Sequence, residues 1–280
     1  QLDEVALSQA IGQAPQRFAG INSNIQLQVP DGSGSYIDFK IYKSNFLPSS
    51  WENKYPNLRS YYVISAYSSL RLTVTPTGIY GMIQQPKKQI IINPLTDDSY
   101  MIFQKQNASL HETDHMTCEL RTQLPDDFSI ENIIQKNQSK IVNDGFLRSY
   151  DLAVATTGEY AQFHIDEANA QNASFDQQIE VVLSAIAVTL SRVNSIYERD
   201  FAVTLELIDN NDDIIYLDEV NDPYSNNSSG SLISENQTNI DNVIGSTNYD
   251  IGHVFSTGGG GLAGLGVVCT SSKASGVTGL

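Results

Sequence analysis

The 280-residue sequence has few cysteines and few basic residues, and each shortage excludes a class of protein. Its two cysteines, Cys118 and Cys269, can form at most one disulfide, which excludes a small scaffold built on disulfides. Lys and Arg number 16 against 32 Asp and Glu, and the net charge of −16 argues against nucleic acid or an anionic membrane as a partner. No apolar run approaches the ~20 residues that a membrane-spanning helix needs.

The rest of the composition is typical of a folded chain. Hydrophobic residues make up 40% of the sequence, enough to build cores, and 280 residues suit one large domain or two ordinary ones. Charged residues account for only 17%, so Asn, Gln, Ser, Thr and Tyr supply most of the surface polarity. The sequence starts at Gln1 rather than Met, as in an artificially expressed segment or after removal of a signal peptide.

Short alternating segments separated by turns predict a β-rich first domain over residues 1–122. Apolar and polar residues alternate over residues 25–29 and 36–42, as in strands with one buried face. The predicted strands cover residues 25–29, 36–42, 70–74, 79–83, 90–92 and 100–103. Turn residues at 30–34 and 76–78 predict two hairpins, and the whole set predicts an antiparallel meander or a small sandwich. Residues 123–145, rich in polar residues, are predicted to be a linker that a processing protease can reach.

Residues 146–280 alternate between strand and helix patterns. The predicted strands cover residues 150–155, 201–208, 250–255 and 265–269. Ser174 and Gln177 form a capping box that opens one helix, and we expect Ser234 with Gln237 to open a second. This order predicts a mostly parallel sheet with right-handed crossovers, so that the protein is α+β overall.

The sequence contains one string with the spacing of a zinc protease motif. His111, Glu112 and His115 match HExxH, which places two imidazoles on one face when it lies on a helix. No helical apolar stripe surrounds the string and no third ligand follows it. We therefore interpret it as a solvated loop, with a working zinc site as the alternative.

The other unusual feature is a run of four glycines, from Gly258 to Gly261. Glycine runs are costly to hold in regular structure, and they suit a crossover that a polypeptide approaches closely. The alternatives are a flexible loop and a nucleotide-binding turn. The second alternative lacks the strand, turn, helix and downstream acidic residue that such a turn requires.

Residues 249–269 combine a predicted strand, the glycine run, a second predicted strand and a cysteine. This order resembles the stretch that precedes the zinc helix of reprolysin-like (adamalysin-like) metalloproteases, a class of metzincins. Segments 39–42, 55–60, 78–83, 93–96 and 100–103 resemble the pro-region of secreted bacterial members. The resemblance covers residues 36–120 as a pro-region and 146–280 as the first half of a catalytic domain.

The resemblance implies the zymogen, or a fragment, of a secreted zinc metalloendopeptidase that hydrolyses peptide bonds in proteins. It implies an α/β metzincin-like subdomain whose Zn²⁺ ligands, in an HExxHxxGxxH helix, follow Leu280, so that the chain alone is inactive. The first domain is then a pro-domain that inhibits the zinc site and binds the chain's own C-terminal catalytic segment. The alternative is a secreted two-module binding protein whose protease-like half is vestigial.

The resemblance also gives roles to individual residues. It implies that a substrate peptide lies along a cleft-rim strand with the following residues at its centre: Gly261, Leu262, Ala263, Gly264, Leu265 and Gly266. Cys118 becomes a candidate zinc latch, with an inert cysteine as the alternative. Cys269 is expected to pair with a cysteine beyond Leu280 or with Cys118. Asp151 aligns with a structural Ca²⁺ ligand, and Asp250 lies one residue out of register with a second, although exposed or salt-bridged carboxylates are the alternative for both. His253 is interpreted as a core histidine.

Overall fold

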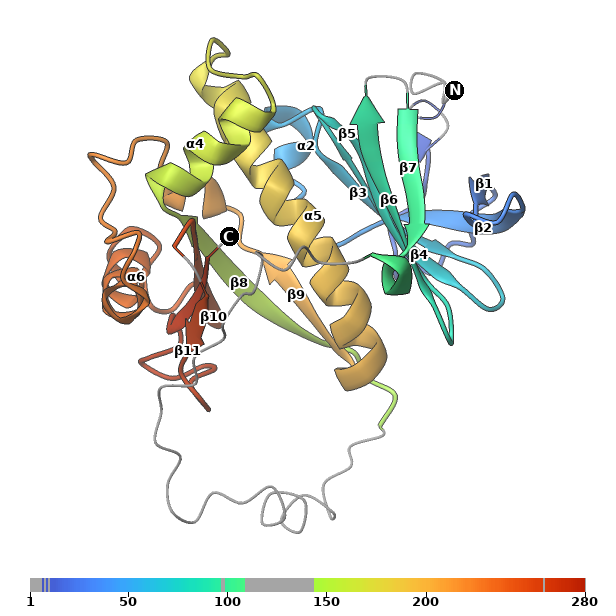
Figure 1. Cartoon of the computed structure of the whole chain (residues 1–280). Helices are drawn as coiled ribbons and strands as arrows, with labels where there is room; N and C mark the ends of the chain where they lie inside the picture. The colour runs from blue at the N-terminus through green and yellow to red at the C-terminus, as the bar shows by residue number, and fades with distance from the viewer. Residues whose placement is uncertain are drawn as a thin grey trace.

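The computed structural model describes residues 7, 9, 11–96, 99–108, 144–258 and 260–279, which form two sheets with helices around them (Figure 1). The HExxH string at 111–115, Cys118 and most of the predicted linker lie outside the described residues. We call the described residues up to 108 the N-terminal module and those from 144 onward the C-terminal module.

The N-terminal module is a single seven-stranded antiparallel sheet in which every strand pairs with the next one along the chain. Its strands are β1 (Gln26–Pro30), β2 (Tyr36–Lys43), β3 (Arg59–Ile64), β4 (Ser69–Thr75), β5 (Gly78–Gln84), β6 (Gln89–Thr96) and β7 (Ser99–Gln104). The predicted meander and its hairpins are confirmed, while β3 was not predicted. The sheet is curled, as shown by Gly32 in the β1–β2 turn, which lies against Ile102 of β7, the strand at the other end of the sheet order. One apolar core lies inside this curl.

The C-terminal module contains a five-stranded sheet in the order β11-β12-β10-β8-β9. These strands are β8 (Arg148–Thr156), β9 (Val203–Leu207), β10 (Ile251–Ser256), β11 (Gly261–Ala263) and β12 (Gly276–Gly279). Three neighbouring pairs are parallel, and only β11 runs antiparallel to its neighbour. The predicted mostly parallel sheet is therefore present.

Three helices cover the two faces of this second sheet: α4 (Gly158–Glu167), α5 (Phe175–Phe201) and α6 (Ser229–Val243). The capping box of Ser174 and Gln177 at the start of α5 is confirmed. The predicted start of α6 is wrong, because Ser228 caps the helix and Ser234 lies inside it, donating to the Ser231 carbonyl. The chain also contains two 3₁₀ turns, η1 (Lys105–Asn107) in the N-terminal module and η2 (Asn211–Ile214) in the C-terminal module.

Helix α5 lies between the two sheets and packs against both (Figure 1). By length and composition α5 is apolar enough to cross a membrane. However, 67% of its most apolar 18-residue stretch is buried inside the molecule, as in a core helix. Helix α6 covers the opposite face of the second sheet. Between β2 and β3 a short helix, α2 (Trp51–Lys54), inserts Trp51 and neighbouring apolar side chains against α5 and the second sheet. The two modules therefore share one core.

Candidate functional site: the open edge at β11

Strand β11 is an edge strand of the five-stranded second sheet. It pairs antiparallel with β12, with Gly261 opposite Thr278, Leu262 opposite Val277 and Ala263 opposite Gly276. Within the part of the chain that the structure describes, no strand pairs with the other side of β11. One row of its backbone groups is therefore available to a further strand.

The hydrogen bonds of the residues just before and just after β11 along the chain show which of its residues face the open edge. Gly279 N donates to Gly260 O at 2.7 Å, and Gly264 N donates to Ser275 O at 2.8 Å. In an antiparallel ladder alternate residues bond toward the same neighbour, so Leu262 also faces β12. Gly261 and Ala263 consequently present their N–H and C=O groups outward. An extended peptide that binds by strand addition needs such groups.

The strand after the glycine run is shorter than the predicted rim strand. Gly261, Leu262 and Ala263 form β11 and Gly264 continues the pairing, but Leu265 and Gly266 lie in an exposed turn. The predicted strand over residues 265–269 is wrong, because Gly266 has a φ of 67° and Cys269 a φ of 58°, which an extended strand does not allow. The chain returns to the sheet only at β12.

Close packing inside the molecule explains part of the glycine run. A Cβ on Gly258 would lie 2.5 Å from the carbonyl oxygen of Asn226, and a Cβ on Gly279 would overlap the Gly258 carbonyl. These two glycines let three backbone segments meet beneath the start of β11. The expectation that glycines allow a substrate to approach therefore does not account for Gly258, whose neighbours belong to the protein.

A buried asparagine, Asn226, fixes the start of this crossover. Its Oδ1 accepts hydrogen bonds from Thr157 Oγ1 at 2.9 Å and from Thr257 N at 3.0 Å, and its Nδ2 donates to Thr257 Oγ1 at 2.8 Å. The side chain ties the end of β8 to the end of β10. Sequence analysis missed Asn226, since it lies in a loop rich in Asn and Ser and carries no motif.

Gly258→Ala is expected to lower the free energy of unfolding by about 2 kcal/mol, because the new methyl group meets fixed backbone. Gly230→Ala is the matched control, since nothing lies within 4 Å of a Cβ at that helical position, and we expect it to be neutral or stabilising by up to about 1 kcal/mol. Urea unfolding followed by circular dichroism measures both. Equal effects of the two substitutions would contradict the packing account.

Cys269 lies next to Asp250, and Asp250 is the residue immediately before β10. The Cys269 thiol is exposed and forms no disulfide with a cysteine in the described part of the chain, and it donates to Asp250 Oδ1 at 3.7 Å. Local desolvation and the Asp250 carboxylate raise the pKa of Cys269, which keeps the thiol protonated. Because Cys118 lies outside the described residues, both pairings considered for Cys269 stay predictions.

The acidic residues near Cys269 do not form a recognisable metal site. Asp250 Oδ2 accepts a hydrogen bond from Asp151 N at 3.0 Å, and the Asp151 side chain is exposed. Among the residues that the structure describes, no group of three or more His, Cys, Asp or Glu is arranged to hold a metal ion. The role of Asp151 in binding Ca²⁺ stays a prediction.

His253 on β10 is partly buried rather than fully in the core, and its side chain has partners within the protein. Its Nε2 lies 2.9 Å from Thr278 Oγ1 of β12, and its ring contacts Phe255 edge-on. Burial lowers the pKa of His253 to about 4. The imidazole is therefore neutral at physiological pH.

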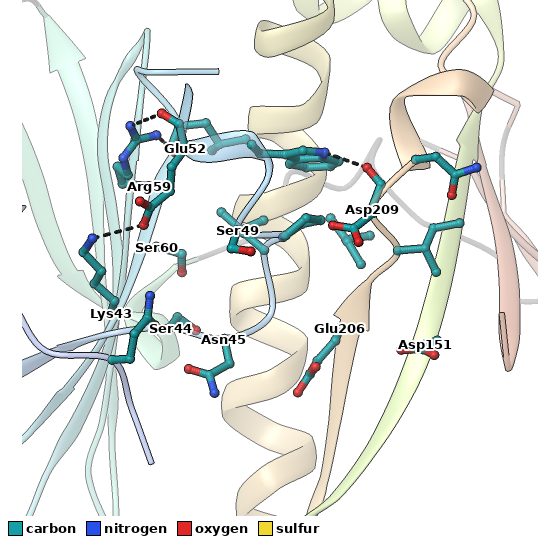
Figure 2. Close-up of a pocket in the computed structure, with 18 of the residues that line it drawn as sticks. Lys43, Ser44, Asn45, Ser49, Glu52, Arg59, Ser60, Asp151, Glu206 and Asp209 are labelled. Carbon is teal, nitrogen blue, oxygen red and sulfur yellow. Dashed lines mark hydrogen bonds and ion pairs between the residues drawn. The ribbon is translucent and has the colours of Figure 1, made fainter. Parts of the chain in front are cut away.

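A cavity of about 730 Å³ lies at the opposite edge of the sheet from β11, between the N-terminal module and residues in and around β9. Figure 2 shows Asp151, Glu206 and Asp209 on one side of it, facing Lys43 and Asn45 on the other. Lys43 is paired with Glu52 at 3.0 Å. Because β9 and β11 are opposite edges of the sheet, this cavity is separate from the open edge.

Comparison with known proteins gives one family. The model of the reprolysin-like metallopeptidases of family M12B matches residues 183–280, which is 98 of the 280 residues. The matched region starts within α5 and includes β9, α6, β10, β11 and β12. No curated protein sequence matches the chain. The match relates the C-terminal module to metallopeptidases, which are zinc-dependent in this family and act on proteins or peptides.

Proposed function

We propose that this chain belongs to the zymogen of a secreted zinc-dependent metalloendopeptidase, with β11 as the rim of its substrate cleft. The observation that carries the proposal is the open antiparallel edge at β11, which lies inside the region matched by the metallopeptidase family. A substrate peptide would add to this edge as an extended strand, bonding to the outward groups of Gly261 and Ala263.

The described residues hold no set of zinc ligands, so no catalytic step is assigned to them. The proposal places the metal ligands in an HExxHxxGxxH helix that follows β12. Zinc bound there would polarise the peptide carbonyl and lower the pKa of a water molecule. The described residues themselves would bind and align the substrate backbone.

In this proposal the N-terminal module is the pro-region. It packs on α5 and the β9 edge, and the β11 edge lies at the other end of the same sheet. The seven-stranded sheet is therefore not suited to inhibit by covering the rim. Inhibition would come from another segment of the pro-region, for which Cys118 remains the candidate latch.

The test is peptide cleavage by the protein made from the complete reading frame. We expect cleavage of a peptide library to be abolished by a zinc chelator and lowered roughly tenfold or more by Ala263→Pro, which removes one outward N–H. Ala66→Pro is the control, since Ala66 is an exposed residue in the turn between β3 and β4. Peptide binding without cleavage would instead favour the two-module binding protein. Cleavage that survives the chelator would reject a zinc peptidase.

A further inference from the structure

The N-terminal module contributes part of the core of the C-terminal module. Phe46, Trp51, Tyr55 and Leu58 are each at most 3% exposed and pack with α5 and the second sheet. Each aromatic side chain of this size covers roughly 150–250 Å². Without the N-terminal module, the corresponding face of α5 would be an exposed apolar patch larger than isolated soluble proteins usually show.

The same segment also occupies the second edge of the C-terminal sheet. Leu207 N of β9 donates to Phe46 O at 2.9 Å. Just beyond β9, Asp209 O accepts a hydrogen bond from Trp51 Nε1 at 2.9 Å (Figure 2). The N-terminal module thus satisfies backbone groups near one sheet edge, whereas β11 at the other edge remains open.

Charged residues reinforce the contact at two places along α5. The Glu180 carboxylate, 3% exposed, accepts from Asn57 N at 2.7 Å and from Asn57 Nδ2 at 3.1 Å. Near the C-terminal end of α5, the Glu198 carboxylate lies between Arg17 and Arg71, at 2.8 and 2.6 Å. Burial alone would raise the pKa of Glu198, but the hydrogen bonds and charges of the two arginines lower it. The carboxylate is therefore ionised at neutral pH.

We infer that the N-terminal module is a permanent non-covalent subunit of the C-terminal module, so that cutting the chain between them does not release it. The shared core, the occupied β9 edge and the two buried carboxylates all cross the contact, and none of them depends on the covalent connection. This inference is independent of the proposed protease function. If that function is right, processing of the linker yields a two-chain protein rather than a free catalytic domain.

The experiment uses the full chain with a recognition sequence for a site-specific protease placed between residues 126 and 140. After complete cutting, gel filtration at about 1 µM should give one peak at the position of the uncut 30.8 kDa chain. Trp51 is the single tryptophan of the sequence and lies in the contact, so its emission reports separation directly. We expect unchanged emission. Two peaks together with a red-shifted emission would overturn the inference.

A matched pair of variants tests the charged part of the contact. Glu198→Gln leaves two arginines without a carboxylate, and we expect the dissociation constant of the cut protein to rise roughly a hundredfold. Asp200→Asn, two residues further along α5, removes an exposed carboxylate that pairs with the neighbouring Arg199, and it should leave the constant unchanged. An equal change in both variants would contradict the role of Glu198.

Discussion

Trp51→Ala lowers the free energy of unfolding of the whole chain by about 3–5 kcal/mol. The substitution removes a side chain that is 3% exposed and fills space between the two modules. It also leaves the Asp209 carbonyl without its indole donor. Because Trp51 contacts both modules, we expect one cooperative urea transition at a lower midpoint, measured by circular dichroism.

Two controls separate packing from the hydrogen bond in this experiment. Trp51→Phe keeps most of the apolar volume and should cost about half as much as Trp51→Ala. Tyr67→Ala removes a side chain that is 86% exposed and should change stability by less than about 0.5 kcal/mol. A Trp51→Ala protein with nearly normal stability would show that the two modules do not share a core.

Acidification from pH 6.5 to pH 4 destabilises the protein through two histidines, His164 and His253. Burial lowers the pKa of each to about 4, whereas both titrate near 6.5 in the unfolded chain. Nε2 of His164 has no hydrogen-bond partner within the described structure. Because the unfolded state binds protons first, the stability is complete above pH 6.5 and falls as the pH drops toward 4.

We expect this loss to be about 2 kcal/mol for each histidine, below the full conversion of the pKa difference because both residues are partly exposed. Urea midpoints measured at pH 7 and pH 4.5 give the difference. The double variant His164→Gln, His253→Gln should lose most of this pH dependence. An unchanged dependence in that variant would assign the acid sensitivity to carboxylates instead.

Local patterns made the N-terminal sheet and α5 predictable. The turn residues within the hairpins β1–β2 and β4–β5 are local signals, and so is the capping box of Ser174 and Gln177. The start of α6 was missed because its first turn, after Ser228, contains serines and a glycine without an apolar stripe. Long-range packing determines where α6 begins, since Leu232 in its first turn is buried against the sheet.

The candidate site was only partly predictable for the same reason. The glycine run indicated a crossover, and β11 does follow it. The length of β11 depended on the left-handed backbone at Gly266 and Cys269, which residue types alone do not specify. Asn226 makes three hydrogen bonds to two distant residues, Thr157 and Thr257, and Trp51 gains its role from α5 and the residues that follow β9. No pattern in the sequence brings such segments together.

The gene sequence that follows the codon for Leu280 tests the account most directly. The account predicts that HExxHxxGxxH, with three zinc-binding histidines and a general-base glutamate, occurs within about fifty codons, on a helix that follows β12. A reading frame that continues without this string, or stops before it, would contradict the assignment of β11 as the rim of a zinc peptidase.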